Sequence, residues 1–132
     1  MAYAVGLALS LIVMWFARAT GLDRDRAFYP ILVIAIASYY VLFAIMAGST
    51  RALIAESIVM VPFLLVAVIG FKANLWLVVV GLAAHGIFDA FHGRFAANPG
   101  VPEWWPAFCS AFDIGAAGFL AWLLMGAKVL AR

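Results

Sequence analysis

The chain has 132 residues, of which 69% are hydrophobic and 11% are charged. Soluble domains are about half apolar and about a quarter charged, and a soluble fold of this length has too little interior to bury so many apolar side chains. The composition therefore predicts an all-α integral membrane protein that forms one transmembrane domain over residues 1–132. The formal charge of +2 comes from scattered Lys and Arg residues, which does not favour nucleic-acid binding.

Five apolar segments predict five transmembrane helices, at about 3–18, 27–48, 52–71, 74–92 and 104–128. The first segment lacks the charged region and the cleavage site of a secretion signal, so we expect it to remain as a span. The longest break contains Asn98-Pro99-Gly100-Val101-Pro102, which excludes a continuous helix. The break between the second and third segments is the weakest, and four spans with one re-entrant segment is the alternative.

The distribution of basic residues predicts the orientation of the helices, because cytoplasmic connections are enriched in Lys and Arg. With five spans, the connection between the second and third helices lies on the same side as that between the fourth and fifth, and this side holds only Arg51 and Arg94. The opposite side holds six basic residues: Arg18, Arg24, Arg26, Lys72, Lys128 and Arg132. We therefore expect an outer N-terminus and a cytoplasmic C-terminus in a plasma membrane, which we take to be the inner membrane of a bacterium.

Five ionisable side chains fall inside the predicted spans, where a charge costs from ~3 to more than ~10 kcal/mol and is usually functional. His85, Asp89 and His92 form an HxxxDxxH pattern, whose spacings of four and three place them on one face of the fourth helix. Glu56 lies near the outer end of the third helix, and Asp113 lies two to three turns into the fifth. We expect all five to line one pocket in the outer half of the bilayer.

This combination of side chains suits Zn²⁺ or another divalent transition metal, because imidazole and carboxylate groups are its usual ligands. We predict His85, Asp89, His92 and Asp113 as metal ligands and Glu56 as a catalytic base. The two histidines are about 10 Å apart along the helix, so a single ion would take Asp89 with one of them and either Asp113 or Glu56. The complete set would suit two ions. An open metal position activates water, which predicts a hydrolase that acts on a lipid-like substrate.

The gathering of His and Asp on helix faces near one membrane surface resembles that in intramembrane metal hydrolases, which are larger proteins. No serine occupies a convincing partner position in the fourth span. Cys109 and Ser110 stand one turn above Asp113, where they line the expected pocket. A single cysteine is most often a small buried apolar residue, and it cannot build a disulfide framework.

Other functions can use the same residues. Stacked carboxylates and histidines can relay protons in a small proton or ion transporter. A path through the whole membrane is weakly supported, because the inner half lacks matching polar residues apart from Ser38, Tyr39 and Tyr40, midway along the second span. Haem is disfavoured, because bis-histidine haem needs ligands on opposite faces of its ring and both histidines share one helix face. A site for a quinone or a carotenoid stays open.

The remaining alternative is structural. In an accessory subunit, Asp89 would accept hydrogen bonds from both imidazoles, and Asp113 or Glu56 would pair with Arg51 or Arg94. Interhelical polar contacts of this kind contribute about 1 kcal/mol or less each, which is little stabilisation for five ionisable groups. A homo-oligomer is compatible with such a small bundle, but no motif requires it.

Overall fold

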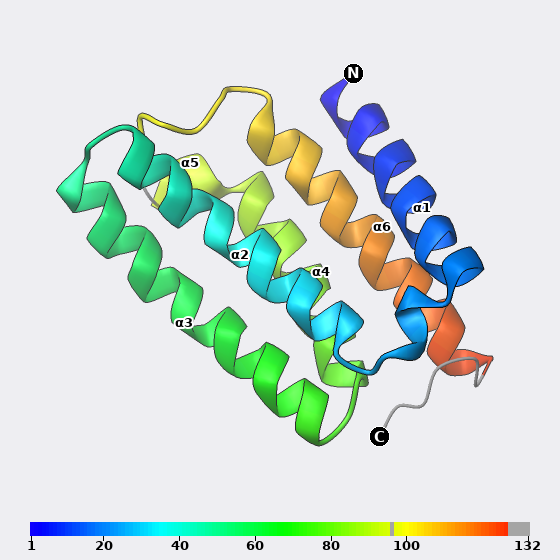
Figure 1. Ribbon diagram of the computed structural model, residues 1–132. Coiled ribbons are helices and arrows are strands. Elements are labelled where there is room, and N and C mark those ends of the chain that lie inside the picture. The colour runs from blue at the N-terminus through cyan, green and yellow to red at the C-terminus, as the bar shows by residue number, and fades with distance from the viewer. Residues whose placement is uncertain (96, 127–132) are drawn as a thin grey trace.

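The computed structural model describes residues 1–95 and 97–126, and within these ranges every regular element is a helix. In chain order these elements are α1 (Ala2–Thr20), the 3₁₀ turn η1 (Leu22–Arg24), α2 (Phe28–Met46), α3 (Thr50–Lys72), α4 (Trp76–Ala90), α5 (His92–Phe95) and α6 (Trp105–Met125). The long helices run antiparallel to their neighbours in sequence (Figure 1). The N-terminus, the α2–α3 turn and α5 therefore lie at one end, called here the N-terminal end of the bundle.

Four helices, α1, α2, α3 and α6, are long and apolar enough to cross a membrane. This confirms the predicted class, a helical membrane bundle with four or five spans. The one predicted span that is not among these four is the span over 74–92. In the structure it corresponds to α4, which has only 15 residues, or about 22 Å. Lys128 and Arg132, which contribute to the predicted orientation, lie outside the described residues.

The predicted helix over 74–92 is interrupted near its end. Phe91 leaves helical geometry, with φ −113° and ψ 12°, and its N–H bonds to the carbonyl of Phe88 at 3.1 Å. The N–H of Arg94 then bonds to the carbonyl of Phe91 at 2.9 Å, which starts the separate helix α5. His92 is therefore not on the same continuous helix as His85 and Asp89.

Local hydrogen bonds end and begin the helices at the connections. Ser49 caps α3, because its hydroxyl oxygen accepts the N–H of Ala52 at 3.2 Å. At the other end of α3, the Arg26 guanidinium donates to the carbonyl oxygens of Phe71 at 2.6 Å and Gly70 at 3.3 Å. A cation at a helix C-terminus is favourable, so Arg26 fastens the start of α2 to the end of α3.

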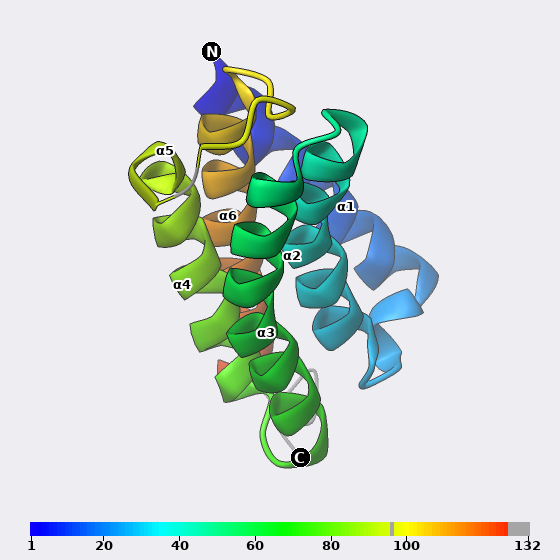
Figure 2. The ribbon, with the colours of Figure 1, turned by 90° about the vertical axis from the view of Figure 1, so that its left-hand side faces the viewer.

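Small residues allow the backbones of α1, α6 and α4 to approach closely. Helix α6 packs against α1 on one side and against α4 on the other, while α4 also contacts α3 (Figure 2). A Cβ on Gly6 would lie 2.1 Å from the carbonyl oxygen of Phe108, and one on Gly86 would lie 2.9 Å from Ile114. The position of α6 relative to both neighbours therefore depends on glycine at these two crossings.

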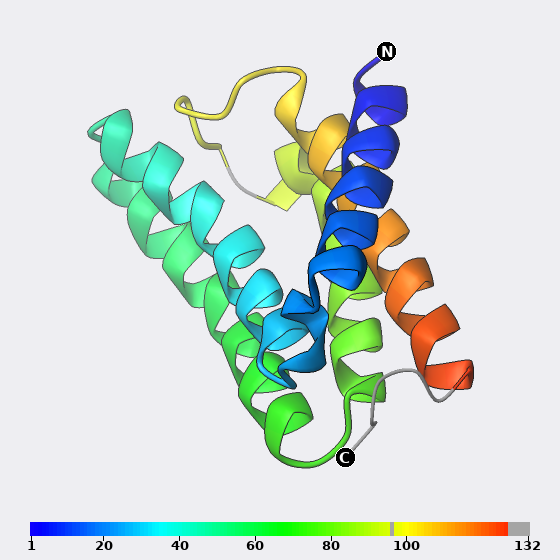
Figure 3. The ribbon, with the colours of Figure 1, turned by 45° about the vertical axis from the view of Figure 1, so that its right-hand side comes forward.

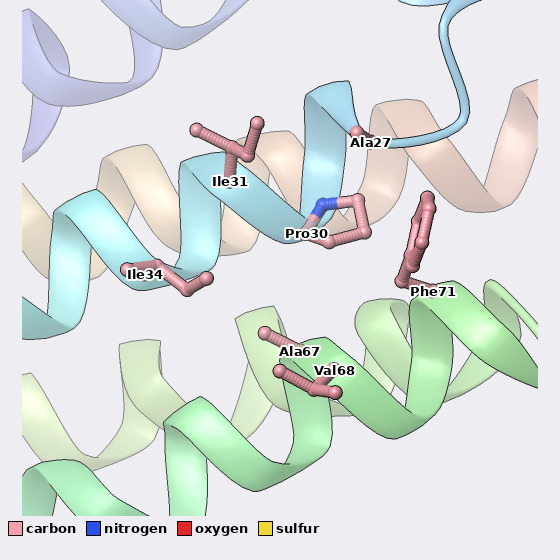
Figure 4. Close-up of a pocket in the computed structure, with 7 residues that line it drawn as sticks. All are labelled: Ala27, Pro30, Ile31, Ile34, Ala67, Val68 and Phe71. Carbon is pink, nitrogen blue, oxygen red and sulfur yellow. The ribbon is translucent and has the colours of Figure 1, made fainter.

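One hollow in the bundle is purely apolar. It lies between α2 and α3 near the ends joined to α1 and α4, and it has a volume of about 150 Å³ (Figure 4). Its walls are Ala27, Pro30, Ile31, Ile34, Ala67, Val68 and Phe71. None of these side chains carries a polar group, so this hollow offers no chemistry.

We predict that Gly6→Ala destabilises the bundle by about 1–3 kcal/mol, because the new Cβ would overlap the Phe108 carbonyl and force α1 away from α6. Gly118→Ala is the matched control, since a Cβ there has nothing within 4 Å and alanine favours helix by about 1 kcal/mol. Thermal unfolding of both variants in detergent measures the difference. Equal melting temperatures would contradict the close crossing.

Candidate metal centre

Two pairs of residues, each four positions apart, meet where α4 packs against α6. Helix α4 contributes His85 and Asp89, and α6 contributes Cys109 and Asp113. One potential ligand atom from each of these four residues lies within 4.8 Å of the others. We call the four residues the His–Asp–Cys cluster, and their exposed fractions are only 0–3%. The group could hold a metal ion.

His85 is at the centre of the His–Asp–Cys cluster. Its Nδ1 atom lies 2.7 Å from Asp113 Oδ2 and 3.3 Å from Asp89 Oδ2. The Cys109 sulfur lies 3.8 and 3.9 Å from the two carboxylate oxygens of Asp113. Nitrogen, oxygen and sulfur donors therefore converge on one small volume that is shielded from solvent.

Two features hold α4 and α6 together beside the cluster. Ser110, the residue after Cys109, donates a hydrogen bond from its hydroxyl to the carbonyl oxygen of Gly86 at 2.8 Å. Gly86 follows His85 directly, and its missing side chain leaves room for Asp113 Cβ, which would be 3.2 Å from a Cβ at this position. The cluster thus lies beside a close approach of α4 and α6.

A second polar group lies next to the cluster. His92 Nε2 is 2.6 Å from Glu56 Oε2, which also accepts a hydrogen bond from Asn98 Nδ2 at 2.8 Å. Glu56 and His92 are 2% and 3% exposed. The other oxygen, Glu56 Oε1, is buried and accepts no hydrogen bond from the part of the chain that the structure describes. This His–Glu pair joins α3, α5 and the connection to α6.

Tyr40 on α2 connects the two groups. Its hydroxyl donates to Asp89 Oδ1 at 2.6 Å, and its ring stacks on His92 with centroids 3.9 Å apart and planes 7° apart. Its backbone carbonyl accepts a hydrogen bond from Asn98 Nδ2 at 2.9 Å. The His–Glu pair and the His–Asp–Cys cluster are therefore neighbours separated by one aromatic ring.

The structure brings together all five residues that the sequence singled out, but it divides them into two groups. His85, Asp89 and Asp113 share the cluster, whereas His92 is paired with Glu56. The physical reason is the break at Phe91, which turns the chain before His92 and directs it to α3. The three acids of the site, Glu56, Asp89 and Asp113, pair with histidines and not with arginines as in the structural alternative.

Three members of the site are only weakly indicated by the sequence. The sequence predicts Cys109 only as a residue that lines a pocket, although its spacing of four from Asp113 places both on one face of α6. The sequence pattern places Tyr40 away from the pocket and marks Asn98 only as part of a helix-breaking segment. No local pattern indicates the roles of Tyr40 and Asn98, because their partners are on other helices.

We predict that Tyr40→Phe lowers stability by about 1–3 kcal/mol, because it removes the hydroxyl donor to the buried Asp89 carboxylate while keeping the ring on His92. Tyr39→Phe is the control, since Tyr39 is the preceding residue and is exposed. Thermal unfolding in detergent compares the two variants. A Tyr40→Phe protein as stable as Tyr39→Phe would show that the hydrogen bond contributes nothing.

No protein-family model, curated protein or solved structure matches this chain. The role of the site is therefore inferred from its side chains, their distances and their burial.

Proposed function

We propose that this chain is a membrane-embedded metalloprotein in which His85, Asp89, Cys109 and Asp113 bind a divalent transition metal such as Zn²⁺. The observation that carries the proposal is the convergence of four buried ligand atoms within 4.8 Å of one another. Zinc takes such ligands at about 2.0–2.3 Å in a tetrahedron, whose corners are then about 3.3–3.8 Å apart. A contraction of about 1 Å, within the reach of side-chain rotation, brings the widest pair to that spacing.

Electrostatics favours a cation at this position. Asp89 and Asp113 are both fully buried, and two carboxylates so close together in a region of low dielectric constant repel each other. A proton on His85 would balance one negative charge, and the Tyr40 hydroxyl stabilises Asp89 without changing the net charge. A divalent ion bound by neutral His85 would balance both carboxylates, and Cys109 would release its proton and bind as a thiolate, so that the centre would carry a single negative charge.

We further propose that the metal serves hydrolysis of an ester or a related bond in a lipid-like substrate. His85, Asp89, Cys109 and Asp113 would hold the ion, which would polarise the bond and activate a water molecule that binds in addition to these four ligands. Water would add to the carbonyl carbon and the bond to the leaving oxygen would break. Glu56 would pass the proton from water to that oxygen through a bridging water, because the Tyr40 ring lies between the His–Glu pair and the cluster. Glu56 suits this role because Oε1 is unengaged among the described residues, while Oε2 is fixed by His92 and Asn98.

The membrane setting supports a lipid-like substrate, since α6, which is long enough to span the bilayer, carries Cys109 and Asp113, and the other spanning helices α2 and α3 carry Tyr40 and Glu56. On the orientation predicted from the basic residues, the N-terminal end of the bundle faces outward, and the site lies in the outer half of a bacterial inner membrane. The non-catalytic alternative, a transporter or an accessory subunit with a structural polar cluster, uses the same contacts without a metal ion.

We predict that protein purified in detergent without chelator contains stoichiometric transition metal, measured by inductively coupled plasma mass spectrometry. Asp113→Asn and Cys109→Ser should lose most of it, because each removes a ligand atom. Asp23→Asn is the matched control, as Asp23 is another buried acid and pairs instead with Arg18 at 3.1 Å. A folded, metal-free protein whose melting temperature is unchanged by chelator would favour the non-catalytic alternative.

Metal analysis of His92→Gln distinguishes the His–Asp–Cys cluster from the ligand set predicted from the sequence, which includes His92. Because His92 contacts Glu56 and lies outside the group of four, this variant should keep its metal. If His92→Gln instead loses metal as completely as Asp113→Asn, the ligand set predicted from the HxxxDxxH pattern is the right one.

We predict that Glu56→Gln retains metal but hydrolyses a fluorogenic lipid ester about 10²–10⁴-fold more slowly than the unchanged protein, which is the usual contribution of a general base. Ser57→Ala, at the next position on α3, should leave the rate unchanged. Hydrolysis by Glu56→Gln at the original rate, with metal bound, would remove Glu56 from the mechanism.

A further inference from the structure

An apolar groove opens between α1, α2 and α6, and its volume is about 360 Å³. The α2–α3 pair diverges from α1 and α6 toward the N-terminal end of the bundle, with the connection to α6 passing above (Figure 3). The groove lies along this divergence. Its walls belong to helices long enough to span the membrane, so its mouth faces lipid and not water.

The groove reaches the His–Asp–Cys cluster. Cys109 is among its lining residues and is also one of the four potential metal ligands, with its sulfur 3.8 Å from Asp113 Oδ1. A molecule in the groove can therefore contact the cluster from the bilayer. The apolar hollow between α2 and α3 offers no such connection, because it has no lining residue in common with the cluster.

The two ends of the groove differ in character. Tyr39 and Trp105 line it at the N-terminal end, where their rings are in edge-to-face contact with centroids 5.1 Å apart. The Trp105 Nε1 atom is buried and has no hydrogen-bond partner among the described residues. Aliphatic residues such as Val13 and Leu32 line the deeper end. This gradient, amphipathic rings above and aliphatic side chains below, matches a lipid with its polar group at the interface.

The length and lining of the groove suit an extended hydrocarbon chain. From Leu32 to Tyr39 the groove follows α2 for about 10 Å, and aromatic and aliphatic side chains line it. Lipid acyl chains surround helices that span the membrane, so they are the apolar molecules that reach its mouth.

We propose that this groove binds one acyl chain of a lipid substrate, which enters sideways from the bilayer and brings its ester group to Cys109 and the metal centre. The proposal rests on the metalloenzyme function above and adds the substrate class and its route. The Trp105 indole N–H is the donor for a carbonyl or headgroup oxygen at the N-terminal end. The chain itself lies against the aliphatic deeper end.

The test is photo-labelling in lipid nanodiscs with a palmitoyl ester that carries a diazirine on its acyl chain, followed by mass spectrometry of the labelled peptides. Labelling should saturate and concentrate on residues 32–39 and 105–112, and an excess of unlabelled palmitoyl ester should compete it away. Contacts with bulk lipid would instead label every exposed helix face in proportion to probe concentration.

Ala35→Trp should fill the groove and lower the saturable labelling about tenfold, because Ala35 lines it and is exposed. Ala84→Trp is the matched control, an exposed alanine on α4 outside the groove. Metal content, measured on the same samples, separates the two proposals. Saturable labelling without metal would support the groove and overturn the metalloenzyme, and bound metal without saturable labelling would overturn the groove.

The mass of the protein assembly in the nanodisc tests whether a second copy of the chain, and not an acyl chain, fills the groove. If saturable labelling is absent and the unchanged protein is a dimer that Ala35→Trp converts to a monomer, the groove is an interface with a second copy of the chain, which overturns acyl-chain binding. A protein whose oligomeric state is the same in both tryptophan variants, with labelling lost only in Ala35→Trp, supports it.

Discussion

The close contact between α4 and α6 is the constraint on which the rest of the site depends. Gly86 lets α6 approach, and the hydrogen bond from Ser110 to the Gly86 carbonyl holds the two helices in register. The same contact places His85 and Asp89 opposite Cys109 and Asp113. A bulkier residue at Gly86 would separate the two halves of the cluster, because Ile114 and Asp113 already occupy the space.

The buried acids explain why the polar side chains form a connected group. A carboxylate without a partner is very costly in an apolar interior, and Glu56, Asp89 and Asp113 each contact an imidazole. Tyr40 links the His–Asp–Cys cluster to the His–Glu pair, because its hydroxyl donates a hydrogen bond to Asp89 and its ring stacks on His92. The connection after α5 also takes part, because Asn98 contacts both Glu56 and Tyr40.

The proposed chemistry and the proposed substrate route share one residue. Cys109 is one of the four residues that could hold a metal ion, and it also borders the apolar groove. The lipid substrate would arrive within the bilayer, while the one water molecule that hydrolysis consumes would have to enter separately. Burial of the cluster strengthens the electrostatic effect of a bound ion. The His–Glu pair stands on the other side of the Tyr40 ring, where it can serve proton transfer without competing for the ion.

The sequence by itself determined the membrane class, because composition decides whether the surrounding solvent is lipid. It also determined two local pairs, since residues four apart on a helix share a face whatever the helix packs against; these are His85 with Asp89 and Cys109 with Asp113. Only the tertiary structure decided that His92 pairs with Glu56, that Tyr40 and Asn98 join the site and that a groove reaches Cys109. Periodicity describes one helix at a time, whereas these features depend on the break at Phe91 and on which helices lie side by side.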